Sequence, residues 1–363
     1  MRFDVAAQSP EGRVPLTGKA AWLMSVDLFV DYLIGVSPEI DAKLHEYLDK
    51  VPPTSPLYAY LYSILDEFVT RGGKRVRPAM TMLACEAVGG EPRKALASGC
   101  AIEFFHAAAL IHDDIMDAST MRRDQKCAHI LHGAPLAINA GDYALGLVCT
   151  IVVRDPGLSD ATKLAVLDVI GEMSARTVEG QALDVGWVRD DVYDLTTDDY
   201  LGMALGKTGY YSGIAPLKVG AIIGGATDEE RRALESFGKN SSIAFQIQDD
   251  LLNIVGDEKT MGKDFMNDVL ESKRTLMIIH CLEQAGPADK TRLVELLRLG
   301  HDKSPDQVLE IVEFLRRYDS IGFARSLARN LIVEAGSYLG VVRESAARDV
   351  LMSMADFFLN REH

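Results

Sequence analysis

Three carboxylates lie close together in one segment of the sequence, at Asp113, Asp114 and Asp117. If this segment is helical, steps of three and four residues bring them to one side of the helix. Apolar residues flank them, so the carboxylates repel one another beside a surface that resists the burial of charge. A cation would relieve this repulsion, and oxygen ligands suit Mg²⁺, which commonly bridges to phosphate. Taken alone, the segment fits a metal site and a solvated acidic helix face equally well.

A second segment repeats this pattern further along the chain, again between apolar residues. Gln246, Asp249, Asp250 and Asn253 follow steps of three, four and seven residues, so a helix would present them on one face. Solvation explains two such faces in one chain less readily than it explains one. The pair therefore predicts two walls of a single site for Mg²⁺ and a diphosphate.

Two acidic walls would repel a diphosphate, so such a site also needs cations. Arginine side chains match phosphate oxygens in a bidentate way, and lysine adds a point charge. The glycine pair at 72–73 would let the backbone approach an anion. Each cation alone fits a solvated surface residue, but their joint placement favours diphosphate binding. The cations near the acidic segments are Arg71, Lys74, Arg75, Arg77, Arg122, Arg123, Lys207 (followed by Thr208), Lys263 and Lys273.

One histidine belongs with the first acidic segment by its spacing. His106 precedes Asp113 by seven residues, which is about two helical turns. A core histidine with a satisfied ring is one interpretation of this position. Because the spacing turns it toward the acidic wall, we expect His106 to contact the ligand.

The composition is that of a globular protein and excludes a general nucleic-acid binder. Of the 363 residues, 48% are hydrophobic and 25% are charged, which is enough apolar material for a large core. The formal net charge is −15, whereas nucleic-acid binding needs a basic face. We therefore expect no nucleic-acid partner.

The cysteines and the apolar stretches indicate a cytoplasmic protein. The five cysteines show no metal-ligand spacing, and we interpret them as reduced thiols that pack as small hydrophobes. The first residues carry charges where a signal peptide needs an apolar run. The stretch Tyr143–Val153 is too short to span a bilayer, and Ser212–Ala226 is interrupted by a proline and a lysine. We expect no stable membrane insertion.

Helical periodicity runs through nearly every long segment, for example 57–71, 98–117 and 228–255. No run alternates as a strand does, and glycine or proline pairs separate several of the helical segments. We predict an all-α fold in which one large domain of ten or more helices covers residues 21–363. Residues 1–20 would form an irregular N-terminal extension.

Together these motifs resemble the trans-isoprenyl diphosphate synthase (polyprenyl synthetase) family, from about residue 37 to the C-terminus. The resemblance implies the isoprenoid synthase fold, with helices around a deep central cavity, usually as a homodimer. It also implies Mg²⁺-dependent head-to-tail prenyl transfer, in which isopentenyl diphosphate joins an allylic diphosphate and diphosphate leaves. The matching motifs are GGKRVRP at 72–78, DDIMD at 113–117, RR at 122–123, GQALD at 180–184, KT at 207–208, FQIQDDLLN at 245–253 and GKD at 262–264.

The resemblance also implies roles for the matching residues. Three Mg²⁺ ions would be bound from the two walls by the catalytic aspartates Asp113, Asp114, Asp117, Asp249 and Asp250. The allylic diphosphate would be held by Arg122, the catalytic Lys207, and Lys263, with Lys273 closing the site. Isopentenyl diphosphate would be held by Lys74, Arg77, His106 and Arg123. Thr208 and Gln246 would lie beside the forming carbocation.

Three features depart from the family pattern. Asn253 stands where the family usually has Asp, and since its amide still offers an oxygen, we expect a weaker Mg²⁺ ligand. Asp124 stands where Gly is common, and its charge beside Arg123 would weaken substrate affinity. The N-terminal extension is longer than the family needs, and no role is assigned to it.

The resemblance places the determinants of product length beneath the first acidic segment. In family enzymes an aromatic at the place of Ala108 stops chain growth early, whereas alanine leaves room for further isoprene units. Phe104 or Phe105 would then form the floor, with Ala109 and Ile102 on the same face. We expect a C20 product, geranylgeranyl diphosphate, with C15 and C25 as its neighbours.

Two other functions are open. A class I terpene cyclase also ionises an allylic diphosphate with Mg²⁺ at an aspartate-rich motif, but it has no second diphosphate site. The segment GGKRVRP, with His106 and Arg123, argues against it. A non-catalytic subunit of a heteromeric synthase would tend to have lost one acidic wall, whereas five of the six expected aspartates are present here.

Overall fold

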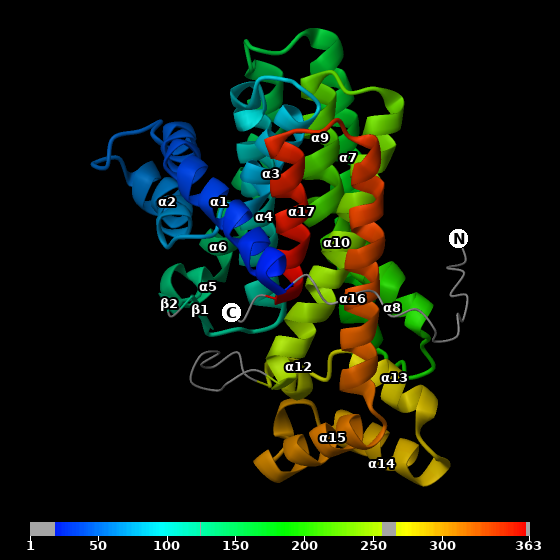
Figure 1. Cartoon of the computed structure of the whole chain (residues 1–363). Helices are drawn as coiled ribbons and strands as arrows, with labels where there is room; N and C mark the ends of the chain where they lie inside the picture. Colours follow the sequence, from blue (N-terminus) through cyan, green and yellow to red (C-terminus); the bar gives the residue numbers. More distant parts are fainter. Residues whose placement is uncertain (1–18, 124, 256–265, 361–363) are drawn as a thin grey trace.

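The computed structural model describes residues 19–123, 125–255 and 266–360, nearly all in helices (Figure 1). This confirms the all-α prediction for the described part of the chain. Two π-helical segments are η1 (Tyr58–Tyr62) and η3 (Leu205–Ile214), and the short 3₁₀ turns are η2 (Pro92–Ala95), η5 (Gly300–Asp302) and η6 (Leu339–Val341). The α-helices are α1 (Lys19–Leu48), α2 (Ser63–Thr70), α3 (Val76–Ala87), α4 (Leu96–Met116), α5 (Ala128–His132), α6 (Ala134–Arg154), α7 (Asp160–Arg189), α8 (Thr197–Ala204), α9 (Ala215–Gly224), α10 (Asp228–Val255), α12 (Asn267–Leu270), α13 (Leu276–Gln284), α14 (Pro287–Leu297), α15 (Pro305–Arg317), α16 (Ser320–Tyr338) and α17 (Ala346–Asn360).

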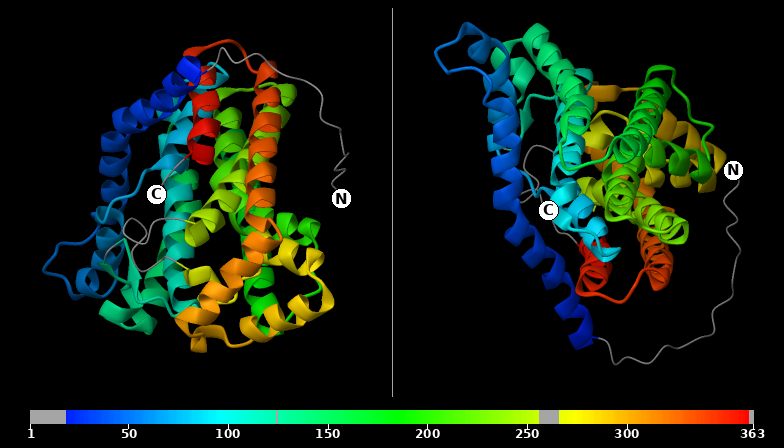
Figure 2. Two further views of the ribbon diagram at one scale, coloured as in Figure 1. Left: turned by 60° about the horizontal axis from the view of Figure 1, so that its bottom comes forward. Right: turned by 90° about the horizontal axis from the view of Figure 1, so that it is seen from above.

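Long helices that run side by side form the body of the protein (Figures 1 and 2). Among them, α10 packs against α16, α9, η3 and α17, while α4 packs against α3 and α6. The long helix α1 lies along one side, and α13, α14 and α15 lie at one end (Figure 1). One continuous hydrophobic core extends from Phe29 of α1 to Phe358 of α17.

Helix α4 carries the first acidic segment at its C-terminal end. Its alanines and its large side chains, such as Ile102 and Phe104, are buried against the neighbouring helices. The helix ends at Met116, and Asp117 is its C-cap residue. Carboxylates there face the negative end of the helix dipole, which adds to their mutual repulsion. This position therefore favours a bound cation.

The π-helical segment η3 carries Lys207 and Thr208 and packs closely against α7. It runs without interruption from α8 into α9, and π-helical turns often lie at functional sites. A Cβ atom on Gly180 of α7 would collide with the backbone nitrogen of Lys207, and one on Gly206 would press on Gly180 in return. The close approach of the two backbones therefore requires glycine at position 180.

Some elements were not apparent in the sequence pattern. Helix α1 begins at Lys19, so the predicted irregular region 1–20 is wrong for its last two residues; residues 1–18 lie outside the described part. Helix α3 has Pro78 in its first turn, where proline is tolerated. A hairpin pairs β1 (Met121–Arg122) with β2 (Gln125–Lys126), and strands of two residues are too short to show alternation.

Two of the described helices are long and apolar enough to cross a membrane by length and composition. The segment Pro92–Met116, which contains α4, is 78% buried over its most apolar window, as expected of a core helix in a soluble fold. Helix α6 includes the stretch Tyr143–Val153 and is 44% buried by the same measure. The other stretch, Ser212–Ala226, lies mainly in η3 and α9, and most of its side chains are buried.

The glycine contact between α7 and η3 is testable with a matched pair of substitutions on α7. Gly180→Ala forces η3 away and should lower the free energy of unfolding by about 1–3 kcal/mol through overpacking. Gly171→Ala meets no atom within 4 Å and should raise it, by up to about 1 kcal/mol, through higher helix propensity. Chemical denaturation of both variants measures the difference. Equal effects on stability would show that the contact does not constrain η3.

Candidate active site

Both acidic segments line one cavity, which we call the acidic cavity. Helix α4 contributes Asp113 and Asp117, and α10 contributes Asp249, Asp250 and Asn253. The structure thus brings together carboxylates that lie far apart in the chain. Lys207, Lys273, Asp184 and Asp268 also line it.

Asp114 is turned toward the β1–β2 hairpin. Its side chain is buried, and Arg122 donates a hydrogen bond from Nε to Asp114 Oδ1 at 2.7 Å. Burial raises the pKa of Asp114, and the Arg122 guanidinium opposes this rise. The geometry separates Asp114 from the pair four residues apart, Asp113 and Asp117, because one step along a helix turns a side chain by about 100°.

Asp184 of α7 joins the two lysines of the acidic cavity. Lys207 Nζ donates to Asp184 Oδ2 at 2.6 Å and lies 3.9 Å from Asp113 Oδ1. Lys273 Nζ lies 3.3 Å from Asp184 Oδ2 and 3.1 Å from Asp117 Oδ1. Burial alone would raise the pKa of Asp184, but the two ammonium groups outweigh it, and the pKa is lowered. Asp184 therefore stays ionised and holds both lysines in place.

The second wall is organised around Asp250. Its Oδ2 accepts a hydrogen bond from the Tyr200 hydroxyl, and its Oδ1 accepts one from Gln246 Nε2, both at 2.7 Å. Thr208 in turn donates from its hydroxyl to Gln246 Oε1 at 2.6 Å. Burial and, to a smaller extent, the Asp249 charge raise the pKa of Asp250 to about 7, although the two donors oppose the rise.

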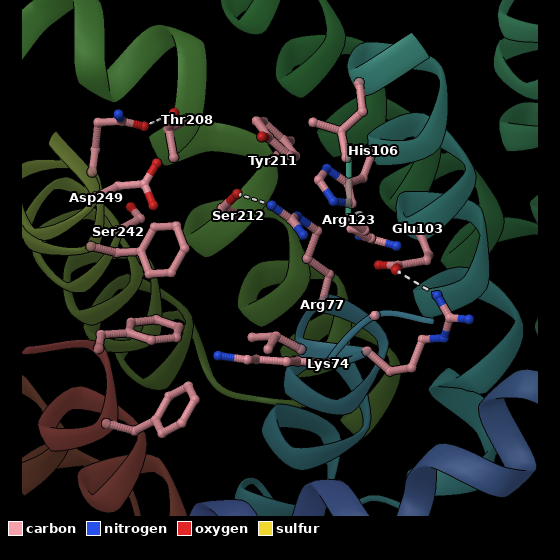
Figure 3. A pocket seen from close by; sticks show the side chains of 18 of the residues that line it. Lys74, Arg77, Glu103, His106, Arg123, Thr208, Tyr211, Ser212, Ser242 and Asp249 are labelled. Atoms are coloured by element: carbon pink, nitrogen blue, oxygen red, sulfur yellow. Dashed lines mark hydrogen bonds and ion pairs between the residues drawn. The ribbon is translucent and has the colours of Figure 1, made fainter. Parts of the chain in front are cut away.

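A second cavity, the basic cavity, shares part of its lining with the acidic one. Cationic side chains gather in it (Figure 3). Its lining includes Lys74, Arg77, His106, Arg122 and Arg123, together with Phe357 and Phe358 from α17. Lys74 and Arg77 come from the loop before α3 and from its first turn, while His106 comes from α4. The predicted cations of the second diphosphate site are thus close together.

Aromatic contacts fix Arg77 and His106. Arg77 lies 4.6 Å from the centre of the Tyr211 ring and donates to Ser212 Oγ at 2.7 Å. The His106 ring stacks on Tyr211, with the centroids 5.6 Å apart. Burial lowers the pKa of His106 well below its usual value, and Arg77 and Arg123 lower it further. His106 is therefore neutral and can serve as a hydrogen-bond donor to a phosphate oxygen.

Arg75, in the same loop, has a structural role. It is a non-glycine residue with φ of 51°, and it is buried. Its guanidinium donates to Asp41 Oδ1 of α1 and to the Val69 carbonyl, both at 2.5 Å, and lies 3.4 Å from Glu103 Oε1. These contacts use its donors within the protein and tie α1 and α2 to the floor of the basic cavity.

Several site residues were not found from the sequence. Gln181 donates from Nε2 to Asp113 Oδ1 at 2.8 Å and lies, like Asp184, in the motif GQALD. The motif matches the family pattern, and the three-residue step between Gln181 and Asp184 could have indicated that they share a helix face. Tyr200 gave no signal, because an isolated tyrosine has no pattern. Lys263 and Asp124 lie outside the described residues.

The donors of the acidic cavity fit Mg²⁺. They are carboxylate oxygens on facing helices, the hard ligands that this ion prefers. Among the described residues, no three Asp, Glu, His or Cys side chains lie close enough to hold a metal ion by themselves. This agrees with the usual behaviour of Mg²⁺, which takes one or two carboxylates and completes its shell with water and phosphate.

Residues 58–315 match the polyprenyl synthetase family. A short chain isoprenyl diphosphate synthase of Methanothermobacter thermautotrophicus is 38% identical over 334 residues, which cover 92% of this chain and 99% of the relative. The chain therefore belongs to the polyprenyl synthetase family, and it is a prenyltransferase.

Solved structures share the fold. The crystal structure of a geranylgeranyl pyrophosphate synthetase from Pyrococcus horikoshii matches with a TM-score of 0.84 and 36% identity, over 93% of this chain and 99% of the other. A polyprenyl synthase from Caulobacter crescentus, complexed with calcium and isoprenyl diphosphate, matches with a TM-score of 0.80 and 25% identity, over 92% and 98%. The isoprenoid synthase fold that the motifs implied is confirmed.

The raised pKa of Asp250 predicts a pH-dependent stability that Mg²⁺ should reverse. The folded protein holds this proton up to about pH 7, whereas the unfolded chain releases it near its ordinary pKa of 3.8. Between these values the folded state binds more protons, so this group lowers stability as pH rises, by at most about 1.4 kcal/mol per pH unit. Asp250→Asn removes the effect, so the variant should gain stability relative to the parent from pH 5 to pH 8.

Thermal unfolding at pH 5 and pH 8, with and without Mg²⁺ and inorganic diphosphate, measures this. The ligands should stabilise the parent more at pH 8 than at pH 5, because ionised Asp250 is the metal-binding form. Asp250→Asn should lose most of that gain. A parent and a variant with parallel pH profiles would contradict the raised pKa.

Proposed function

We propose that this protein condenses isopentenyl diphosphate with an allylic diphosphate, head to tail, and releases diphosphate, with geranylgeranyl diphosphate (C20) as the main product. The observation that carries this is the pair of adjoining cavities of opposite charge. Thr208, Tyr211, Gln246 and Asp249 line both of them. Two anionic substrates can thus meet with their hydrocarbon ends at a shared boundary.

The acidic cavity suits the allylic diphosphate. Asp113, Asp117, Asp249 and Asp250, with Asp114 behind them, would hold three Mg²⁺ ions, which neutralise charge that develops on the leaving diphosphate. Lys207, Lys273 and Arg122 line this cavity and add fixed positive charge there. Asn253 would contribute least, because its Oδ1 already accepts the Asp268 backbone N–H at 3.0 Å.

The basic cavity suits isopentenyl diphosphate. Lys74, Arg77 and Arg123 supply the charge, and neutral His106 supplies a hydrogen bond. A diphosphate bound by arginine and lysine alone does not need a metal ion. This division accounts for the carboxylates that gather in one cavity and the cations that gather in the other.

The chemistry follows from this arrangement. The allylic C–O bond breaks and its electron pair leaves with the diphosphate, while the double bond of isopentenyl diphosphate supplies the pair for the new C–C bond. Thr208 and Gln246 line both cavities, so they lie at the boundary where the cation would form. A proton then passes from the adjacent carbon to the departed diphosphate. Apolar walls keep water from the cation.

Incorporation of labelled isopentenyl diphosphate tests the function. With C5, C10 or C15 primers and Mg²⁺, we expect prenyl products, with C20 predominant, and no incorporation after chelation. Asp113→Ala should reduce kcat/KM by at least about 100-fold, because removal of charge stabilisation at the leaving group acts on the transition state. Activity that survives both chelation and Asp113→Ala would disprove the mechanism.

A third cavity beneath the first acidic segment suits the growing chain. Its lining is mainly apolar and includes Phe105, Ala109, Leu145, Val178 and Tyr211. Ile102, Phe104 and Ala108 are buried but are not among the described residues that line it. The geranylgeranyl synthetase of P. horikoshii and the short chain synthase of M. thermautotrophicus support a product of this size.

Phe105 is the residue that we expect to limit chain length. It lies against Tyr211, with the ring centroids 5.9 Å apart, and lines this cavity. Phe105→Ala should shift the product from C20 toward C25 or longer. Phe104→Ala is the matched control: that ring packs against Tyr47 instead, so the variant should lose stability by about 3–5 kcal/mol without longer products. Chromatography of the dephosphorylated products distinguishes them, and unchanged lengths for Phe105→Ala would exclude Phe105 as the floor.

The protein is further proposed to act as a homodimer in the reducing cytoplasm. Apolar side chains remain exposed on the neighbouring helices α6 and α7, as expected of a surface that a second copy covers. They are Ile138, Val153, Leu164 and Leu183. Four of the five free cysteines are buried, which suits a reducing compartment.

Two alternatives are less well supported. A terpene cyclase has no use for the basic cavity, and incubation with one allylic diphosphate alone would release hydrocarbon if this were its function. A non-catalytic subunit would not need Asp113, Asp117, Asp249 and Asp250 to face one another. The same incorporation assay with the purified chain alone distinguishes it.

A further inference from the structure

Lys303 lies between η5 and α15 and is buried, although no substrate cavity includes it. Its ammonium donates three hydrogen bonds: to the Leu270 carbonyl at 3.2 Å, to Ser272 Oγ at 2.6 Å and to the Gly300 carbonyl at 2.8 Å. Burial, with a smaller contribution from the Arg274 charge, lowers the pKa of Lys303 to about 8. At neutral pH the group is still mainly protonated, so all three donors are present.

Ser272 is the centre of this contact. Its φ is 57°, in the left-handed region that side chains with a Cβ rarely adopt. Its hydroxyl accepts from Lys303 and donates to the Leu297 carbonyl at the end of α14, at 2.6 Å. A strained backbone of this kind persists only where its surroundings hold it. Lys303 and the end of α14 supply that restraint.

The turn that Ser272 forms delivers Lys273 to the acidic cavity. The Lys273 backbone N–H donates to the Asp268 carbonyl at 2.9 Å, and its ammonium reaches Asp117 and Asp184. On the other side, buried Arg274 donates to the Ser272 carbonyl and to the Val192 carbonyl. Lys273 thus projects from a turn in which Ser272, Lys273 and Arg274 each make hydrogen bonds to neighbouring elements.

We propose that Lys303, through Ser272, is a positioning residue that fixes Lys273 for the allylic diphosphate. The inference rests on the proposed function, in which Lys273 acts on that substrate. Without the ammonium, the Leu270 and Gly300 carbonyls and the Ser272 hydroxyl lose a shared donor, and the turn is free to relax. The Lys273 ammonium then spends less time at the diphosphate, while the basic cavity on the far side is unaffected.

The test compares Lys303→Met, which keeps the unbranched stem, with Lys290→Met at an exposed lysine on α14. We expect Lys303→Met to raise the KM for the allylic diphosphate about tenfold, as for other residues that orient a binding group. The KM for isopentenyl diphosphate should stay within about twofold, and Lys290→Met should match the parent for both substrates. Equal rises in both KM values, or none, would overturn the proposal.

A binding measurement separates this from a general loss of folding. Calorimetry with Mg²⁺ and an allylic thiolodiphosphate, which does not ionise, should show about tenfold weaker binding for Lys303→Met. Ser272→Gly keeps the left-handed turn but removes the hydroxyl, so it should weaken the same binding. The double variant should be little worse than Lys303→Met alone, because the two residues act as a unit.

The possible failures are distinct. A parent that neither incorporates isopentenyl diphosphate nor binds the thiolodiphosphate would refute the proposed function. An active parent with Ser272→Gly and Lys303→Met effects that simply multiply would leave that function intact and overturn the positioning role.

Discussion

The structure depends on a balance of charge in the acidic cavity. Carboxylates converge there from α4, α7 and α10, and two lysines lie among them as counter-charge. Asp184 accepts both Lys207 and Lys273, and each lysine also reaches a carboxylate of α4. The ion pairs place fixed positive charge where a diphosphate would bind, before any substrate arrives. Such preorganisation is the usual source of large electrostatic effects in catalysis.

Unusual backbone conformations place the two lysines of the acidic cavity. Lys207 lies in a π-helical segment that only glycine at position 180 allows so close to α7. Lys273 follows Ser272, a left-handed residue, and the loop before α3 contains another at Arg75. Each costs conformational energy, and each is held by buried partners. The segments that present Lys74 and Lys273 to the two cavities thus each contain a left-handed residue.

In the basic cavity it is the cations that repel one another. Partners within the protein hold several of these side chains in different ways. Arg75 is engaged by Asp41 and Glu103, Arg77 lies on the Tyr211 ring, and His106 is held neutral. The charge that remains for a ligand is therefore limited, and its position is fixed.

The sequence alone determined the helical class and the principal motifs. The spacing of Asp113 and Asp117, and of Gln246 and Asp250, is four residues, which brings each pair to one face of any helix that contains it. The sequence also predicted that cations accompany these motifs, because most of the cations lie close to them in the chain.

Tertiary structure decided which of these groups face one another. Spacing grouped Asp114 with its neighbours, but packing turned it toward Arg122. The role of Asp184 as the partner of two lysines, and that of Lys303 behind Ser272, join residues from different elements. Such pairings depend on how α7, α12 and α15 pack against their neighbours. Contacts of this kind join residues that lie far apart in the chain, so no local sequence pattern predicts them. The two acidic faces thus follow from local spacing. The lysines that balance their charge, and Asp184 that holds those lysines, are brought to the site only by the tertiary structure.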